Sequence, residues 1–140
     1  MMLDDIATYL ISSTAFTLLA GSVGNLVKSD MPDTAPAPDT IIALYETAGV
    51  TGSYTFSTST IIERVWERPR LQILSRSSSY PVARANAQTA YGMLDGVTGP
   101  LPTSSGTVYT VSAVQAPFDI GRDKNLRHLV STNYQVERQA

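Results

Sequence analysis

Apolar residues recur at helical spacing close to the N-terminus of the chain. Over residues 3–12 they form one face of a helix, made of Leu3, Ile6, Ala7, Leu10 and Ile11. Asp4 and Asp5 fall in the first turn, where negative charge interacts favourably with the helix dipole. The pattern predicts an amphipathic helix that lies on a sheet, with Gly21 and Gly24 as the firmest stops after it.

A second helix is predicted over residues 80–96. Pro81 stands near its start, where a missing backbone donor is tolerated, and Gly96 suits its end. Its apolar stripe is rich in alanine, which lets a helix approach a sheet closely. The stripe consists of Ala83, Ala87, Ala90, Tyr91 and Leu94.

Strand patterns fill much of the remaining chain. Polar and apolar residues alternate most clearly from Ile61 to Glu67, and again after Pro69. Because proline lacks a backbone donor, Pro69 indicates a strand start, a bulge or an edge. A run of β-branched and aromatic residues predicts a strand over 40–48 that ends at Gly49. Further strands are predicted over 25–29, 107–115 and 129–137.

Proline, glycine and polar residues predict the connections. Residues 30–39 are rich in proline and are expected to form a stiff exposed connection. Residues 49–60 are polar and contain glycine, so a hairpin loop is expected there. Residues 97–106 and 118–128 are expected to be loops as well.

This order of elements predicts an α+β fold in a single domain spanning residues 1–140. We expect a mostly antiparallel β-sheet of four to five strands, with two α-helices packed on one face. The last strand, 129–137, is expected to lie at an edge of the sheet and to end in a short polar tail.

Composition narrows the possible functions. Apolar residues make up 43% of the chain and charged residues 16%, a low charged fraction that suggests surface covered by partners. The net charge of −2 gives no overall attraction to nucleic acid or to an anionic membrane. No cysteine is present, which excludes disulfides and thiolate metal sites. The N-terminal apolar stretch has no Lys or Arg before Lys28 and is interrupted by polar residues, so we expect neither a signal peptide nor a membrane span but a soluble intracellular protein.

The sequence contains only weak signals for a catalytic or metal-binding site. His128 is the only histidine, and with Asp119 and Asp123 it forms a sparse set for a metal. A serine–histidine–aspartate triad is no better supported, because no nucleophile-elbow pattern exists. Lys28 in "GNLVKS" lacks the preceding glycine of a phosphate-binding loop. We therefore expect no enzyme activity, no metal and no cofactor.

The arginines of the predicted strands are the most informative polar residues. Arg64, Trp66 and Arg68, continuing toward Arg70, place cations beside an aromatic ring, a combination that can grip phosphate and stack a base. The adjacent glutamates, Glu63 and Glu67, favour ion pairs within the protein or between subunits instead. Arg70 and Arg76 suit a fork-shaped contact to a neighbour's carboxylate or carbonyls.

The chain resembles the small neck proteins of long-tailed bacteriophages that are called minor capsid or tail-terminator (tail-completion) proteins. The resemblance extends over nearly the whole chain and rests on the order and spacing of "LDDIATYL", "MPD…IIALYETAG", "ERPRLQIL", "YPVARANA" and "QAPFDIGRDKNLRHLVSTNYQVE". These segments carry no chemistry of their own. The polar "SRSSSYP" departs from the expected pattern and puts the helix packing near it in doubt.

The resemblance implies a structural virion protein, assembled in the bacterial host cytoplasm, that forms a ring, usually of six copies. Such a ring sits on the tail tube, ends its polymerisation and joins the tail to the head-side connector or stopper protein. Its implied partners are further copies of the chain, the major tail tube protein, the connector, and genomic DNA passing through the lumen without specific binding. No membrane partner is implied.

We expect charged and aromatic residues of the predicted strands and of the last loop to make the subunit or partner contacts. They are Arg64, Trp66, Arg68, Arg70, Arg76, Arg122, Asp123, Arg127 and His128. Replacing Arg76 or Arg122 by alanine is expected to disturb assembly more than monomer stability, because neither has an obvious carboxylate partner in its own element. Two alternatives stay open: a head-side completion protein at the portal, and a nucleic-acid-binding module that uses Arg64, Trp66 and Arg68.

Overall fold

The computed structural model describes residues 2–32, 38–56, 62–101 and 108–139. This part of the chain contains two helices and seven strands. Their bounds are α1 Met2–Ile11, β1 Leu26–Lys28, β2 Ile41–Phe56, β3 Ile62–Ser77, α2 Tyr80–Leu94, β4 Thr98–Pro100, β5 Val108–Ala113, β6 Phe118–Arg122 and β7 His128–Gln139. Both helices lie where the apolar periodicity predicts them.

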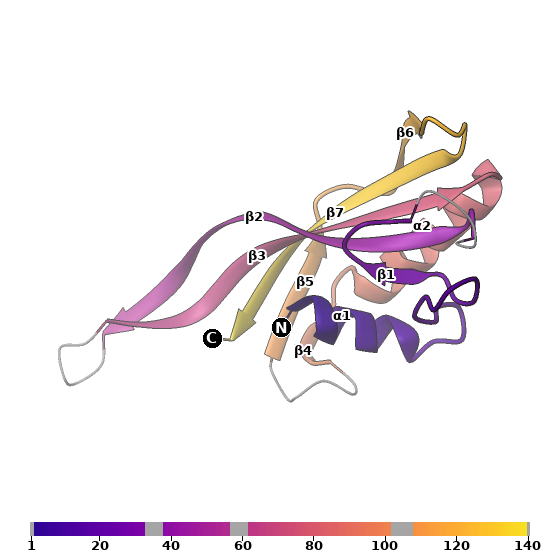
Figure 1. Ribbon diagram of the computed structural model, residues 1–140. Helices are drawn as coiled ribbons and strands as arrows, with labels where there is room; N and C mark the ends of the chain where they lie inside the picture. Colours follow the sequence, from indigo (N-terminus) through magenta and orange to yellow (C-terminus); the bar gives the residue numbers. More distant parts are fainter. Residues whose placement is uncertain (1, 33–37, 57–61, 102–107, 140) are drawn as a thin grey trace.

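The strands form one curled sheet in the order β1-β2-β3-β7-β5-β4, with β6 also paired to β7 (Figure 1). The α+β class is confirmed, but the expected four to five strands are too few. The sheet is also mixed, because β1 runs parallel to β2 while the other pairs are antiparallel. The additional strands, β4 and β6, are short and contain glycine, the composition from which loops were predicted.

The core lies between one face of the sheet and the two helices, which cover the same face as predicted (Figure 1). From α1, the residues Leu3, Ile6 and Leu10 enter it, which confirms the predicted apolar face. The sheet contributes alternate residues of its central strands, as expected when one face of a strand is buried. These are Ile42 and Leu44 of β2, Leu71 and Ile73 of β3, and Tyr134 and Val136 of β7.

Helix α2 lies close to the sheet because its buried residues are small. Ala83 and Ala87 pack against Val130 of β7, and the Ser75 hydroxyl on β3 donates a 2.8 Å hydrogen bond to the Ala83 carbonyl. Tyr91, expected in the same stripe, is only half-buried. Ser75, the first residue of the polar "SRSSSYP" segment, is therefore joined to α2 by a hydrogen bond, while residues 78–81 of the segment are exposed.

Polar contacts tie α1 to the rest of the fold. The Tyr109 hydroxyl on β5 donates to the Asp5 carboxylate, and the Tyr9 hydroxyl donates to the Met93 carbonyl over 2.9 Å. Burial first, and then the Asp5 carboxylate, raises the pKa of Tyr109 to about 12. The hydroxyl thus stays protonated as a donor across the physiological range.

Strand β7 lies inside the sheet, so the prediction of an edge strand at the C-terminus is wrong. One side of β7 pairs with β3, while β5 and β6 share the other side. The chain bends between β5 and β6 at residues 114–115, and the Pro117 carbonyl just before β6 accepts a 2.9 Å hydrogen bond from Arg84 of α2. Residues 118–122, expected to be loop, form the edge strand instead.

Strands β2 and β3 are longer than predicted. Residues 49–56, expected to belong to a hairpin loop, continue β2, while residues 57–61 lie outside the described part of the chain. The β2–β3 register shifts between the pairs Thr47–Arg70 and Val50–Arg68, so two residues of β2 lie opposite Pro69. Of the three interpretations of Pro69, a strand start, a bulge or an edge, the structure agrees with a bulge, although the extra residue belongs to β2. The proline-rich connection is described only in part, because residues 33–37 also fall outside it.

The far end of this hairpin extends beyond the rest of the sheet. The pairing of β3 with β7 ends at Trp66 and Gln139. Among the described strands, Ile62–Val65 pair with β2 alone. We call residues 48–56 of β2 together with 62–65 of β3 the arm. It projects away from both helices, at the left of Figure 1.

The outer edge of β1 is covered by the preceding loop. The Leu19 amide donates to the Leu26 carbonyl and the Leu26 amide donates to the Thr17 carbonyl, each over 2.9 Å. The loop can lie this close because Gly24, with φ +96°, has no side chain, and a Cβ there would come within 2.3 Å of the Leu18 carbonyl oxygen. Neither helix of the described chain is long and apolar enough to cross a membrane.

Candidate functional site

The predicted contact residues separate into two groups in the structure. Arg76, Arg122, Asp123, Arg127 and His128 gather where β3 ends and β6 turns into β7. The others follow β3 toward the arm: Arg64, Trp66, Arg68 and Arg70. The first group is the candidate site, because residues far apart in the sequence meet there.

Arg76 is buried inside the subunit, with 1% of its surface exposed. Its Nε donates to the Asp39 carbonyl over 3.1 Å, and its Nη2 donates to the Pro38 carbonyl over 3.0 Å. The fork-shaped contact to carbonyls thus exists, but within the same chain rather than to a neighbour. Arg76 was expected to bind a neighbouring subunit because it has no carboxylate partner in its own strand. This reason does not hold, since the carbonyls of Pro38 and Asp39, from a distant segment of the same chain, bind its guanidinium.

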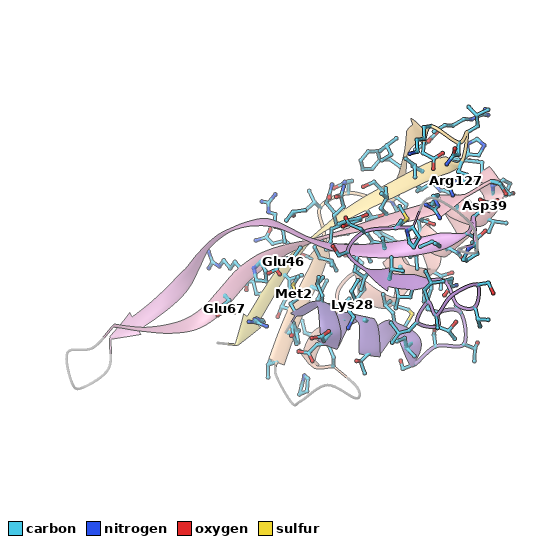
Figure 2. The ribbon with its side chains drawn as sticks, in the orientation of Figure 1. Met2, Lys28, Asp39, Glu46, Glu67 and Arg127 are labelled. Carbon is cyan, nitrogen blue, oxygen red and sulfur yellow. The ribbon has the colours of Figure 1, made fainter. Side chains whose placement is uncertain are left out.

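Arg127 also contacts the segment of residues 38–39, through the Asp39 carboxylate. Its Nε donates to Asp123 Oδ2 over 2.8 Å, and its Nη1 lies 3.4 Å from Asp39 Oδ1 (Figure 2). The side chains of Arg127 and Asp123 are 5% and 17% exposed, so this pair is largely shielded from solvent, whereas the Asp39 side chain is 60% exposed. Two buried arginines consequently fix Pro38 and Asp39 at the end of the sheet.

Asp123 organises the β6–β7 turn. Its Oδ1 accepts hydrogen bonds from the Asn125 and Arg127 amides, each over 2.9 Å. Burial by itself raises the pKa of Asp123, but these amides and the Arg127 guanidinium outweigh it, so the pKa lies below its usual value. The carboxylate is therefore a structural anion that shapes the turn.

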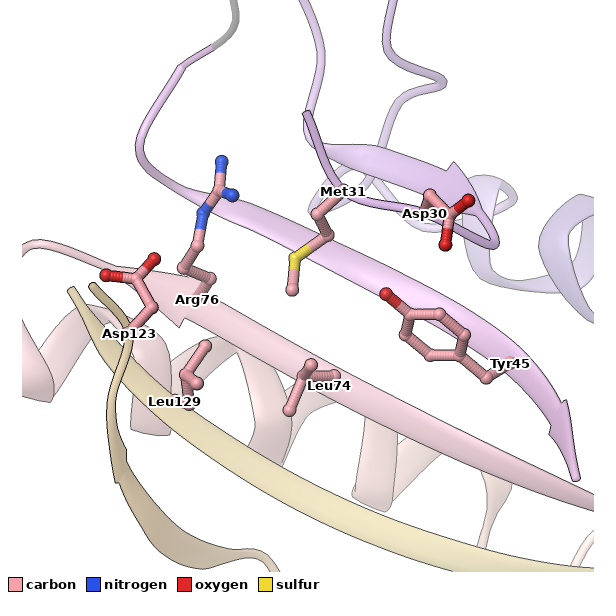
Figure 3. A pocket seen from close by; sticks show the side chains of 7 residues that line it. All are labelled: Asp30, Met31, Tyr45, Leu74, Arg76, Asp123 and Leu129. Carbon is pink, nitrogen blue, oxygen red and sulfur yellow. The ribbon is translucent and has the colours of Figure 1, made fainter. Parts of the chain in front are cut away.

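A cavity of about 370 Å³ opens beside these residues, on the sheet face opposite the helices (Figure 3). Met31 points from the segment after β1 toward Leu74 and Leu129 (Figure 3). The complete lining is Asp30, Met31, Tyr45, Leu74, Arg76, Asp123 and Leu129. Since Arg76 and Asp123 already bind their own chain, this lining does not present a set of groups directed at a small ionic ligand.

His128 lies at the start of β7 and is half-buried. Its ring packs edge-on against Tyr80 of α2, with centroids 5.6 Å apart at an angle of 66°. Within the described residues, no three His, Cys, Asp or Glu side chains come close enough to hold a metal ion. His128 therefore packs between β7 and α2. Asp123, in the turn between β6 and β7, forms its ion pair with Arg127 instead.

The second group is partly neutralised by carboxylates across the strands. Arg68 Nε lies 3.5 Å from Glu137 Oε1, and Arg138 Nε donates to Glu67 Oε2 over 2.6 Å. Cross-strand ion pairs therefore exist here, but Glu67 pairs with Arg138 and Arg68 pairs with Glu137, so the partners are residues of β7 that the sequence analysis did not name. Arg122, in contrast, lies on β6, where every residue is exposed.

The residues of the predicted nucleic-acid face do not alternate regularly between the two faces of the sheet. A register shift separates the pairs Ser53–Trp66 and Tyr54–Arg64. A shift of one residue reverses the face on which a side chain lies. The grouping of Arg64 with Trp66 on one face therefore stays a prediction.

Charged groups that bind their own chain, an exposed edge strand and a projecting arm are typical of a subunit that works by contact with other proteins. The chain matches the family of bacteriophage tail terminator proteins over residues 15–140, and it belongs to that family. This confirms the resemblance found in the sequence. The family is structural rather than enzymatic.

Solved structures share the fold. The chain is similar to one from the virion of the native gene transfer agent (GTA) particle, with a TM-score of 0.63 and 13% identity, over 99% of this chain and 95% of that chain. A second solved chain has a TM-score of 0.55 and 14% identity, over 99% of this chain and 91% of its own length. No curated protein sequence matches. Identities this low show the fold alone.

Proposed function

We propose that the chain forms a ring of identical subunits, six in number, at the top of the phage tail tube. There it ends polymerisation of the tube and joins the tail to the head-side connector. The observation that carries this proposal is the family match over residues 15–140. The partners are other copies of the chain, the major tail tube protein and the connector or stopper protein.

Genomic DNA is a passing partner in this proposal and is not bound specifically. The net charge of −2 supports this, because it provides no overall attraction to phosphate. The ion pairs Arg68–Glu137 and Arg138–Glu67 support it further, since a paired arginine is a weaker ligand for phosphate. A ring whose lumen is lined by Arg64, Arg68 and Arg70 would contradict it.

The test is electron microscopy of lysates from a parent phage that cannot make this protein. We expect full heads beside separate tails of abnormal or uncontrolled length, with normal particles restored when the intact chain is supplied in trans. Tails of uniform length beside heads that lose their DNA would overturn the proposal. That outcome would move the protein to the head side, at the portal.

A nucleic-acid-binding module is the second candidate, and a separate measurement removes or supports it. The purified chain is applied to immobilised duplex DNA at low salt and eluted with increasing salt. No retention at low salt would remove this candidate. Salt-dependent retention that is lost in Arg64→Gln would support it.

A further inference from the structure

The exposed strand β6 is an open edge of the sheet. In the described chain β6 pairs only with β7, so its outer side presents unpaired backbone groups. Phe118 and Ile120 on this strand are 40% and 46% exposed. Open edges in soluble proteins usually carry lysine or proline, or are covered. β6 is short, carries Asp119 and Arg122 and has a register shift at Gly121, which are features that limit unspecific pairing. Its two exposed apolar side chains nevertheless indicate a surface that a specific partner can cover.

At the opposite edge of the sheet, the outer side of β1 is covered by another part of the same chain. There β1 is shielded by residues 17–19, which bond to Leu26 within the same chain. The chain thus covers one edge of the sheet itself, whereas within the described residues no strand covers the outer side of β6. β4 is a poorer partner surface than β6, because it has three residues and includes Pro100.

The arm is the complementary feature. Its described strands pair with each other and extend past the end of β7. A two-stranded ribbon is marginally stable in water unless a third strand or a helix packs on it. Its sequence is nevertheless rich in strand-forming residues and has just two charges, Glu63 and Arg64. Such a segment gains stability when it joins a sheet.

The arm and β6 lie at opposite ends of the subunit (Figure 1). Two different surfaces that fit each other form a head-to-tail contact. Such a contact gives a ring when its rotation closes after a whole number of copies, and an open filament when it does not. Charge is compatible with this pairing. Residues 118–127 carry Asp119 and Asp123 against Arg122, Lys124 and Arg127, and the arm with its base carries Glu46 and Glu63 against Arg64, so the two surfaces have small net charges of opposite sign.

We propose that the arm of one copy adds to the β6 edge of the next copy, so that the sheets continue from subunit to subunit around the ring. Backbone hydrogen bonds would provide the pairing, and Phe118 and Ile120 would be covered by the incoming ribbon. This contact deepens the proposed ring function and rests on it.

Disulfide cross-linking tests the contact directly, because the chain contains no cysteine. The double variant Thr55→Cys with Ile120→Cys places one thiol on the arm and one on β6. It is supplied to the parent phage that lacks the protein, and purified particles are oxidised and run on a gel without reductant. We expect a ladder of covalent multimers of this chain that collapses on reduction.

Matched controls make the result specific. Each single variant alone should give no ladder. The pair Thr55→Cys with Val23→Cys places the second thiol beside the covered edge instead, at a residue that is 72% exposed, and should also give none. A ladder from this control pair, or monomers alone from the Thr55–Ile120 pair, would overturn the proposed contact.

Tail length in the same particles separates the two proposals. Tails of normal length without the ladder mean that the ring function stands and the arm contact is wrong. Loss of length control is tested independently by the phage that lacks the protein. Monomers alone would also be the outcome if the arm binds the tail tube protein rather than a second copy.

Discussion

The two ends of strand β3 have opposite surroundings. At one end, Arg76 is buried and bonded to the carbonyls of Pro38 and Asp39, and Ser75 is bonded to α2. At the other end, Ile62–Val65 pair with β2 alone within the described chain. One strand therefore belongs both to a packed core and to a ribbon without a core. The core of the subunit lies around the first end, and the second end is the arm for which we propose a contact with the next copy.

The largest expected difference in stability is between two isoleucine-to-alanine variants, one at each end of β3. Ile73→Ala removes a fully buried side chain and should lower the free energy of unfolding by about 3 kcal/mol. Ile62→Ala, in the arm, should lower it by less than about 1 kcal/mol in the dissociated subunit. Urea unfolding followed by circular dichroism measures both. Equal losses would show that the arm is part of the cooperative core.

Two arginines provide the next test. Arg76→Ala should lower the free energy of unfolding by about 2–4 kcal/mol, because it removes a buried guanidinium and leaves the 38–39 carbonyls without their donor. Arg122→Ala is the matched control at an exposed position, and its effect should stay within about 0.5 kcal/mol. For Arg122 we keep the prediction of an assembly defect, measured by the yield of complete particles. A stable Arg76→Ala subunit would refute the structural role given to Arg76.

Alanine substitutions at two glycines compare the stability of the covered edge at β1 with that of the open edge at β6. Gly24→Ala should cost about 2–3 kcal/mol, because a Cβ would meet the Leu18 carbonyl and the backbone has φ +96°. Gly121→Ala, on β6, has a similar φ of +106° but open space around it, so about 1 kcal/mol is expected from strain alone. Thermal unfolding of the two variants gives the difference. If Gly121→Ala were the more harmful, the open edge would be the more constrained one.

The smallest effect is a dependence on pH. The pKa of Asp123 is lowered in the folded chain, so its contribution is present above the unfolded pKa of about 3.9 and is lost as pH falls through the folded value. Asp123→Asn should therefore be less stable than the natural chain at about pH 6, and the gap should close toward about pH 2. Urea unfolding across this range measures it. A gap that does not change with pH would show that the charge of Asp123 is unimportant.

Local patterns predicted the helices because their causes are local. The face of Leu3, Ile6 and Leu10 and the alanines of α2 specify which side is buried. The irregular pairing opposite Pro69 has a local cause as well, because this residue has no backbone donor, and a bulge was one of the three interpretations that this allowed. The family resemblance, carried by the order of segments, was confirmed as well.

The missed elements depend on distant neighbours. Residues 49–56 contain Gly49 and Gly52 and are typical of a loop, yet they continue β2 because β3 provides a full-length partner. β6 becomes a strand only because β7 lies beside it, and this also moves β7 away from the edge. Arg76 was assigned to the surface because its partners, Pro38 and Asp39, lie far away in the sequence.

The continuity of β3 has a mechanical consequence. Its hydrogen bonds to β2 and β7 run across the strand, and on the β7 side the pairing includes residues 66–67 and 70–77, with a break at Arg68 and Pro69. A load applied along the arm therefore acts on many of these bonds together, in shear, instead of peeling them one after another. The strand delivers that load to the end where Arg76 anchors residues 38–39. A subunit pulled by its arm would resist as a whole.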